Sequence, residues 1–347
     1  MANNNFKPFA TAGGANVTAQ ADYEALAALL TGFVSGTAQS AQLNKVWRQS
    51  SIMAAVLAQF IVDLTGQDAI DDGTIATLLA NLKTAVQAQS AAAIGQSRNL
   101  VMNVGAASAN ATLTADEIVV GTAPGGKKYV LGSFSKTINL AATGAGGMDT
   151  GSAPASGYVA LYAIYNPTKA AQHATDPITY PDNGMALLAT NATSTVAPNV
   201  YGGANMPSGY TASALVSVWQ TDASSRFGVA YQQDRDYFFA PATVLSTTAQ
   251  TSVLTALSIA ALVPKNAKYV RGETVVATSG AVNAGMQVAG SASGFGRADN
   301  ALSTSGAQSF NSWFSQIPLV TAQQMYYNFN GSSGTVTFTL ILSGYSI

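Results

Sequence analysis

The feature that most constrains the fold is an uninterrupted apolar repeat from Ala41 to Leu64, a stretch without glycine or proline. Its positions alternate in steps of three and four residues: Leu43, Val46, Ser50, Met53, Leu57, Phe60 and Leu64. Such spacing is typical of the a/d seam of a coiled coil. Four more apolar residues widen the stripe: Trp47, Ile52, Val56 and Ile61. A wide stripe favours a bundle of at least three helices, either between copies of the chain or within one chain.

Two shorter helices are expected on either side of this repeat. The first should begin near Thr18 as its N-cap, with Asp22 and Glu24 in the early turns, where the helix dipole favours acids. Its apolar face would consist of Tyr23, Leu26, Leu30 and Phe33. The other should follow the residues 71–74, with an apolar face made of Ile75, Leu78, Leu79, Leu82 and Val86. Residues 1–96 are therefore predicted to form a helical bundle or coiled-coil region.

From about residue 100 the apolar pattern changes to period two, which is typical of strands. The clearest segments are 158–165, 214–219 and 335–342, and glycine-rich stretches separate them. The sequence thus predicts an α+β multidomain chain in which antiparallel β-sandwich modules follow the helices. Lys128–Gly132 recurs with one change as Lys268–Gly272. This suggests a duplication, with modules at 97–245 and 246–347, although coincidence in a chain rich in tyrosine and glycine gives the same recurrence.

The composition points to an assembled protein. Charged residues make up only 9% of the chain, whereas an ordinary soluble domain has about 25%. A surface with so little charge suits a chain that shares its surface with copies of itself, and a secreted β protein is the alternative. The net charge of −1 and the lack of a basic stripe argue against nucleic-acid binding. No signal peptide and no membrane span are expected from the apolar pattern.

Catalytic and metal-binding motifs are missing from the sequence. Cysteine is absent, and the single histidine, His173, has no Gly-x-Ser-x-Gly serine to activate. The neighbouring acids at 71–72 and 234–236 suit a helix start and a charged turn better than the paired carboxyls of a glycosidase. The glycine clusters do not match a phosphate-binding loop. We therefore predict no enzyme, no metal and no cofactor, with an active site assembled from separate segments as the alternative.

Aromatic residues are the best candidates for recognition of a partner. Tyr201 and Tyr210 flank a loop rich in glycine, asparagine and proline, and are expected to be exposed for contact with a receptor. Trp219 and Trp313 each lie in an apolar stretch and are expected in the core.

Several segments of the sequence resemble segments of one family of proteins. The N-terminal ones are 9–17 (FATAGGANV), 20–26 (QADYEAL), 43–51 (LNKVWRQSS) and 71–73 (DDG). The later ones are 138–151 (INLAATGAGGMDTG) and 208–217 (SGYTASALVS). Together they resemble tail-fibre proteins of tailed phages, prophages and tailocins.

This resemblance implies a homotrimer in the virion tail, made in the host cytoplasm before assembly. Its N-terminal region would attach to other tail or baseplate proteins. Its β region would face a host-surface polysaccharide or an outer-membrane protein. Because the chain is short, a proximal connector or collar fibre without receptor contact is an alternative, and a tail-spike-like polysaccharide depolymerase is another.

Overall fold

The computed structural model describes residues 2–33, 36, 39–88, 92–332 and 336–347. These residues divide into two compact units, Met1–Ala91 and Ala92–Ile347. Thr335, the expected first residue of the last strand, lies outside the described residues.

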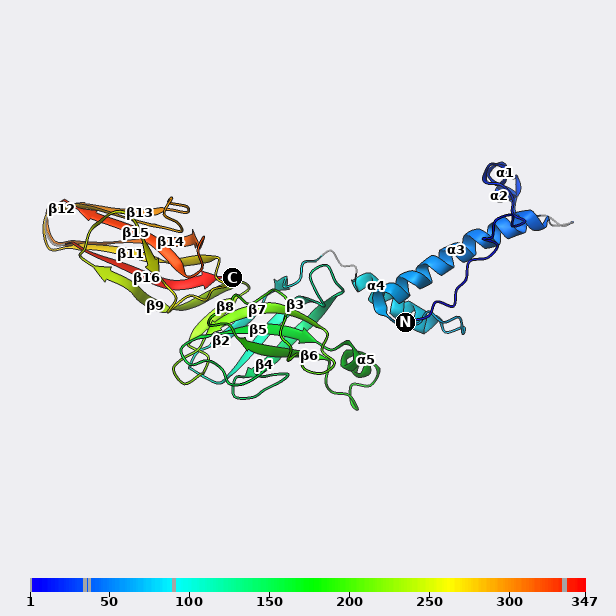
Figure 1. The fold of residues 1–347 in the computed structure, drawn as a ribbon, viewed down its shortest axis with the longest axis horizontal. Coiled ribbons are helices and arrows are strands. Elements are labelled where there is room, and N and C mark those ends of the chain that lie inside the picture. Colours follow the sequence, from blue (N-terminus) through cyan, green and yellow to red (C-terminus); the bar gives the residue numbers. More distant parts are fainter. Residues whose placement is uncertain (1, 34–35, 37–38, 89–91, 333–335) are drawn as a thin grey trace. The chain divides into compact units, whose positions relative to one another are not determined.

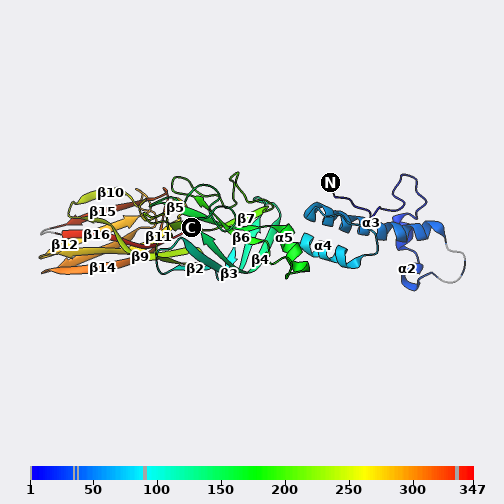
Figure 2. The ribbon, with the colours of Figure 1, turned by 90° about the horizontal axis from the view of Figure 1, so that it is seen from below.

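The first unit is helical (Figure 1). Its described helices are α1 (Gln20–Glu24), α2 (Ala28–Thr31), α3 (Ser40–Thr65) and α4 (Ile75–Ala88). The long helix α3 matches the uninterrupted apolar repeat, and it ends where Gly66 adopts a left-handed conformation and donates its N–H to the carbonyl of Val62. α4 lies beside the C-terminal half of α3 (Figures 1 and 2). Ala58 and Ile61 of α3 and Ala85 of α4 are buried in this unit.

The prediction that the first helix is one continuous element is wrong. The chain forms the short helices α1 and α2 instead, and the N-cap of α1 is Ala19 rather than Thr18, without a side-chain cap. Thr18 donates its N–H to Ala41 at the start of α3. Of the expected apolar face only Tyr23 is buried, and Leu30 is 95% exposed. Because a helix in a protein depends mainly on a packed face, this segment has little to hold it in one piece.

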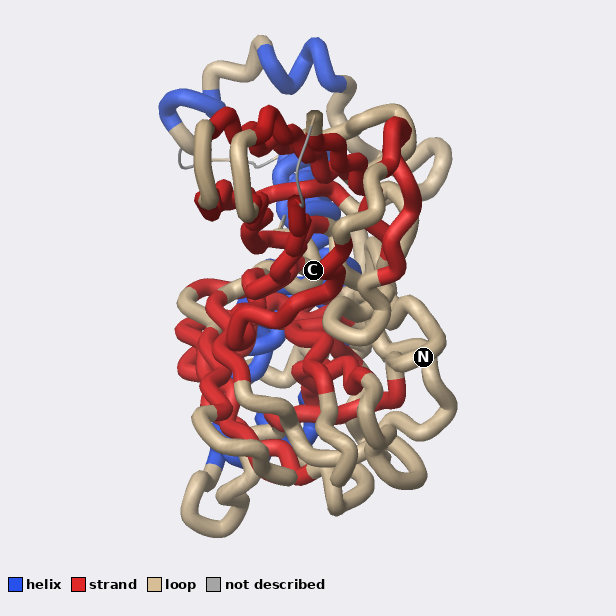
Figure 3. Tube along the Cα trace, turned by 90° about the vertical axis from the view of Figure 1, so that its left-hand side faces the viewer, coloured by secondary structure: helices blue, strands red, loops and turns tan. Residues whose placement is uncertain are grey.

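The second unit consists mostly of strands and the loops that join them (Figure 3). In its first part the strands are β1 (Ser97–Arg98), β2 (Val101–Val104), β3 (Asn110–Gly121), β4 (Lys128–Asn139), β5 (Tyr158–Tyr165), β6 (Met185–Asn191), β7 (Ala212–Gln220) and β8 (Ala230–Gln233). The helix α5 (Pro167–Thr175) follows β5. The later strands are β9 (Asp236–Thr247), β10 (Thr251–Ser258), β11 (Tyr269–Thr278), β12 (Val282–Ala289), β13 (Ala298–Thr304), β14 (Gln308–Pro318), β15 (Gln324–Gly331) and β16 (Val336–Ser346).

The described ladders between these strands are antiparallel, which confirms the expected sheet type. One sheet has the order β14-β11-β16-β9-β8-β2-β3-β7-β5-β6, with β1 and β4 also paired to β3, and a second has the order β10-β15-β12-β13. The core of the later part lies between these two sheets, where Phe329 of β15 meets Phe338 of β16. In β16 the alternating residues Val336, Phe338, Leu340 and Leu342 are buried, as their period predicts.

The strand β9 joins the earlier and later parts of this unit. Its first residues pair with β8, and it also pairs with β16. The sheet is therefore continuous across β9, and the expected module boundary between residues 245 and 246 falls within this strand.

The strands β5 and β7 are buried on both faces. One face contributes Val159, Leu161 and Val216 to the main core, and the other lies under loops that include Tyr201 and Tyr210. Trp219 of β7 is fully buried and donates its indole N–H to the carbonyl of Gly228 over 2.9 Å. Its expected place in the core is confirmed.

A tight contact between β11 and β16 allows a test of the packing. A Cβ atom at Gly272 would lie 2.0 Å from the carbonyl oxygen of Ile341, whereas one at Gly132 of β4 would meet nothing within 4 Å. Gly272→Ala is expected to lower the free energy of unfolding by about 1–3 kcal/mol, because the two strands must separate to admit the methyl group. Urea unfolding measures this, with Gly132→Ala as the matched control. Equal stabilities of the two variants would contradict the close contact between Gly272 of β11 and Ile341 of β16.

Buried tyrosines make stability fall at high pH. Burial raises the pKa of the phenols of Tyr158, Tyr162, Tyr237 and Tyr345 well above their ordinary value. Tyr162 and Tyr345 also donate their hydroxyl hydrogens to backbone carbonyls, of Pro198 and Val218. A raised pKa in the folded state means that the unfolded state loses the proton first. Stability from these groups is thus complete below pH about 10 and is lost as the pH rises above it.

The measurement is a titration of phenolate absorbance with circular dichroism at each pH. We expect the most buried tyrosines to ionise together with the loss of β structure. Complete ionisation of all 14 tyrosines in a protein with unchanged circular dichroism would contradict this.

Candidate binding surfaces

The apolar stripe of α3 is largely open in the single chain. Met53 is 59% exposed and Leu57 is 49% exposed. Ser50 is exposed as well, and the other four predicted seam residues are half-buried: Leu43, Val46, Phe60 and Leu64. Exposed apolar groups in a row along a helix are typical of an interaction surface. The structure brings the predicted seam onto one helix but covers none of its seven residues fully.

The N-terminal segment covers one side of the stripe. Asn4 donates its side-chain N–H to the carbonyl of Ala55, and Phe9 donates its backbone N–H to the hydroxyl of Ser51. The ring of Phe9 meets Trp47 edge to face, with 6.0 Å between centroids. The groove between this segment and α3 includes Ile52 and Val56. Met53 and Leu57 are not among the residues that line this groove, and they stay exposed.

The predicted receptor-contact residues Tyr201 and Tyr210 are buried, with 9% and 7% of their surfaces exposed. The hydroxyl of Tyr201 donates to the carboxylate of Asp149 over 2.9 Å, and its ring packs edge to face on Tyr162. Burial, followed by this hydrogen bond to Asp149, raises the pKa of Tyr201. The expectation that both rings are exposed was wrong, because the loop between them folds down onto β5 and β7. Neither ring has an open face for stacking.

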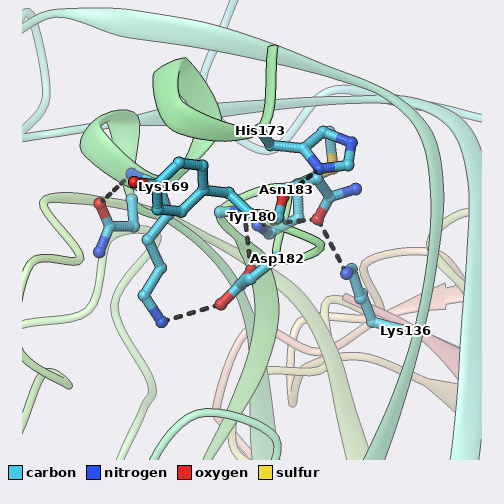
Figure 4. Close-up of polar contacts among 9 residues, drawn as sticks. Lys136, Lys169, His173, Tyr180, Asp182 and Asn183 are labelled. Carbon is cyan, nitrogen blue, oxygen red and sulfur yellow. Dashed lines mark hydrogen bonds and ion pairs between the residues drawn. The ribbon is translucent and has the colours of Figure 1, made fainter. Parts of the chain in front are cut away.

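A polar cluster that includes Lys169, Asp182 and Asn183 lies beside α5 (Figure 4). The ammonium of Lys169 lies 2.8 Å from the carboxylate of Asp182 and 5.6 Å from the centre of the Tyr210 ring. Burial raises the pKa of Asp182, but the hydrogen bonds from Lys169 and the N–H of Gly184 outweigh it and lower the pKa overall. Lys136 of β4 donates to the side-chain oxygen of Asn183. These contacts tie the loop after α5 to its neighbours.

The single histidine lies in the same cluster. Nδ1 of His173 is 2.7 Å from the carbonyl oxygen of Tyr180, seven residues later in the chain (Figure 4). This contact joins α5 to the loop that follows it. A hydrolytic triad needs the imidazole between a nucleophile and an acid, and this contact is with a backbone carbonyl. The geometry therefore suits a structural role for His173.

Within the described ranges, no group of His, Asp and Glu side chains is arranged to hold a metal ion. In the same part of the chain, none of the helices has the length and apolar character needed to cross a membrane.

Trp313 is the residue that sequence reasoning missed. It was expected in the core, and this was wrong: it lies on β14, at the edge of the larger sheet, and is 71% exposed. The indole borders a hollow of about 360 Å³ whose other lining residues are Arg271, Gly272, Phe314, Ser315 and Ser343. An exposed tryptophan beside a hollow that two serines also line is a candidate binding site.

No protein-family model matches the chain, and no curated protein matches it. Among solved structures, the insecticidal delta-endotoxin Cry8Ea1 from Bacillus thuringiensis aligns at 10% identity and a TM-score of 0.22, over 77% of this chain and 55% of the toxin. This chain thus spans about half of the toxin's length. A mutant VP2 protein of infectious bursal disease virus aligns at 11% identity and a TM-score of 0.17, over 75% of this chain and 76% of VP2. TM-scores this low carry no inference about fold or function.

Proposed function

We propose that this protein is a non-enzymatic, homotrimeric component of a phage or tailocin tail fibre. The observation that carries the proposal is the open apolar stripe of α3, where Met53 and Leu57 are about half exposed in the single chain. Closing that stripe against two sister helices would remove these side chains from water, at about 25 cal/mol per Å² of apolar surface buried. The resemblance of the N-terminal segments to tail fibres supports the same assignment.

In this proposal the N-terminal unit binds other tail or baseplate proteins, and the β unit contributes to attachment at the host surface. Charged residues make up only 9% of the chain, which suits a protein whose surface is largely covered by neighbouring proteins in an assembly. The protein would be found in the virion tail after assembly in the host cytoplasm.

Light scattering on the purified protein tests the oligomeric state. We expect a mass three times that of the 35.3 kDa chain. A monomer that persists at high protein concentration would refute the trimer. A density map of the intact particle tests the location, because the chain should occupy a position of threefold symmetry on the tail.

A further inference from the structure

The hollow beside Trp313 lies where the sheet is irregular on both sides of one strand. In the pairing of β11 with β14, Arg271 faces the two residues Ser315 and Gln316 instead of one. In the pairing of β11 with β16, Ser343 has no partner. Two bulges therefore flank the same position of β11. Bulges redirect side chains and are common beside functional sites.

The face of the sheet around this hollow carries several polar groups. On β11 the buried residues Val270, Gly272 and Thr274 point toward the second sheet, so the alternate residues Arg271 and Glu273 lie on the outer face. Trp313 is the direct cross-strand partner of Glu273 and shares this outer face with it. The carboxylate of Glu273 accepts a hydrogen bond from the side-chain amide of Asn311 over 3.2 Å. The indole is thus a large apolar group near carboxylate, amide and hydroxyl groups.

The side chain of Arg271 crosses β16, so its guanidinium lies against β9 and not beside Trp313. Its Nη2 donates to the carboxylate of Asp236 and to the hydroxyl of Ser346, and the guanidinium stacks on the ring of Phe238 at 4.4 Å from the centroid. The methylene groups of Arg271 lie over Gly344, where a Cβ atom would approach them to 3.1 Å. The guanidinium is therefore occupied by contacts with β9 and with the end of β16.

We propose that the hollow formed by Trp313, Arg271, Ser315 and Ser343 is a saccharide-binding site. A sugar ring has one face of C–H groups, which would stack on the exposed indole, and a rim of hydroxyls that both donate and accept hydrogen bonds. The serine hydroxyls and the Glu273 carboxylate provide both kinds of partner. The core of an interface between two copies of the chain is usually depleted in carboxylates, whereas this face carries Glu273. The inference deepens the host-attachment part of the proposed function, on which its biological meaning rests.

A printed array of bacterial O-antigen and capsular saccharides is the first test, followed by calorimetric titration with the saccharide that binds best. Trp313→Ala is expected to weaken binding at least about fivefold, since truncation of a central aromatic anchor costs more than about 1 kcal/mol. Trp313→Phe should retain part of the affinity. Phe310→Ala is the matched control: Phe310 lies on the same strand and is 48% exposed, but it pairs with Val276, which points toward the second sheet.

Failure to bind any saccharide on the array overturns the proposal, as does unchanged affinity in Trp313→Ala. A lower oligomeric mass of Trp313→Ala would show instead that this face joins copies of the chain. The titration is repeated with Leu57→Asp, a change in the other unit. Saccharide affinity per site should be the same whether or not that variant is trimeric. The proposal of a saccharide site is therefore tested independently of the proposal of a trimer.

Discussion

Leu57→Asp is expected to convert the proposed trimer to a monomer in which the β unit is still folded. Leu57 lies near the middle of the α3 stripe and is 49% exposed in the single chain, so the substitution costs little in an isolated subunit. In a closed three-helix seam the same change would bury three carboxylates close together. An unpaired buried charge costs several kcal/mol, and three like charges at one level of the seam repel one another.

Light scattering measures the loss of trimer, and circular dichroism measures the retained β structure. The control is Gln49→Asp, which adds the same charge at an exposed position of α3 outside the predicted seam. We expect this variant to keep the wild-type mass. A fully trimeric Leu57→Asp protein would mean that the stripe is covered by something other than sister helices.

Trp219→Ala is expected to lower the free energy of unfolding of the β unit by about 3–5 kcal/mol, since it leaves a large cavity in a core that cannot collapse around it. The indole is fully buried and meets Phe227 and Tyr237 edge to face, with 6.2 and 4.6 Å between centroids. The truncation also leaves the carbonyl of Gly228 without its donor.

Trp313→Ala is the matched control, because it removes the same side chain from the same unit. Its indole is 71% exposed, so the free energy of unfolding should change by no more than about 0.5 kcal/mol. Urea unfolding followed by far-UV circular dichroism compares the two variants without relying on tryptophan fluorescence. Similar losses in both would contradict the placement of these residues in the sheet.

Local patterns were sufficient to predict several elements. The uninterrupted repeat predicted α3 almost to its ends, because a long helix follows from apolar spacing and the absence of glycine and proline. The segment 158–165 coincides with β5, and 214–219 lies within β7. Burial at alternate positions of β16 follows from its sequence in the same way. The broken first helix was missed because its continuity depends on a packed face, which local spacing does not reveal.

Long-range contacts decided the candidate sites. The burial of Tyr201 depends on Asp149 and Tyr162, residues 52 and 39 positions earlier in the chain. The hollow at Trp313 depends on Arg271 and Ser343, which arrive on two other strands. The local sequence around Tyr201 or Trp313 does not predict which distant strand will lie beside that residue.

The two tryptophans of the β unit show where the sequence stops being informative. Trp219 has Ser217 and Thr221 two residues away on either side, and Trp313 has Asn311 and Ser315. Both segments therefore predict a strand with an indole in line with small polar groups, and both do form strands. β7 lies inside the larger sheet, under a core on each face, whereas β14 is its edge strand. The packing over each strand leaves one indole in the core and the other in water, because burial depends on what covers a strand face and not only on the residues within the strand.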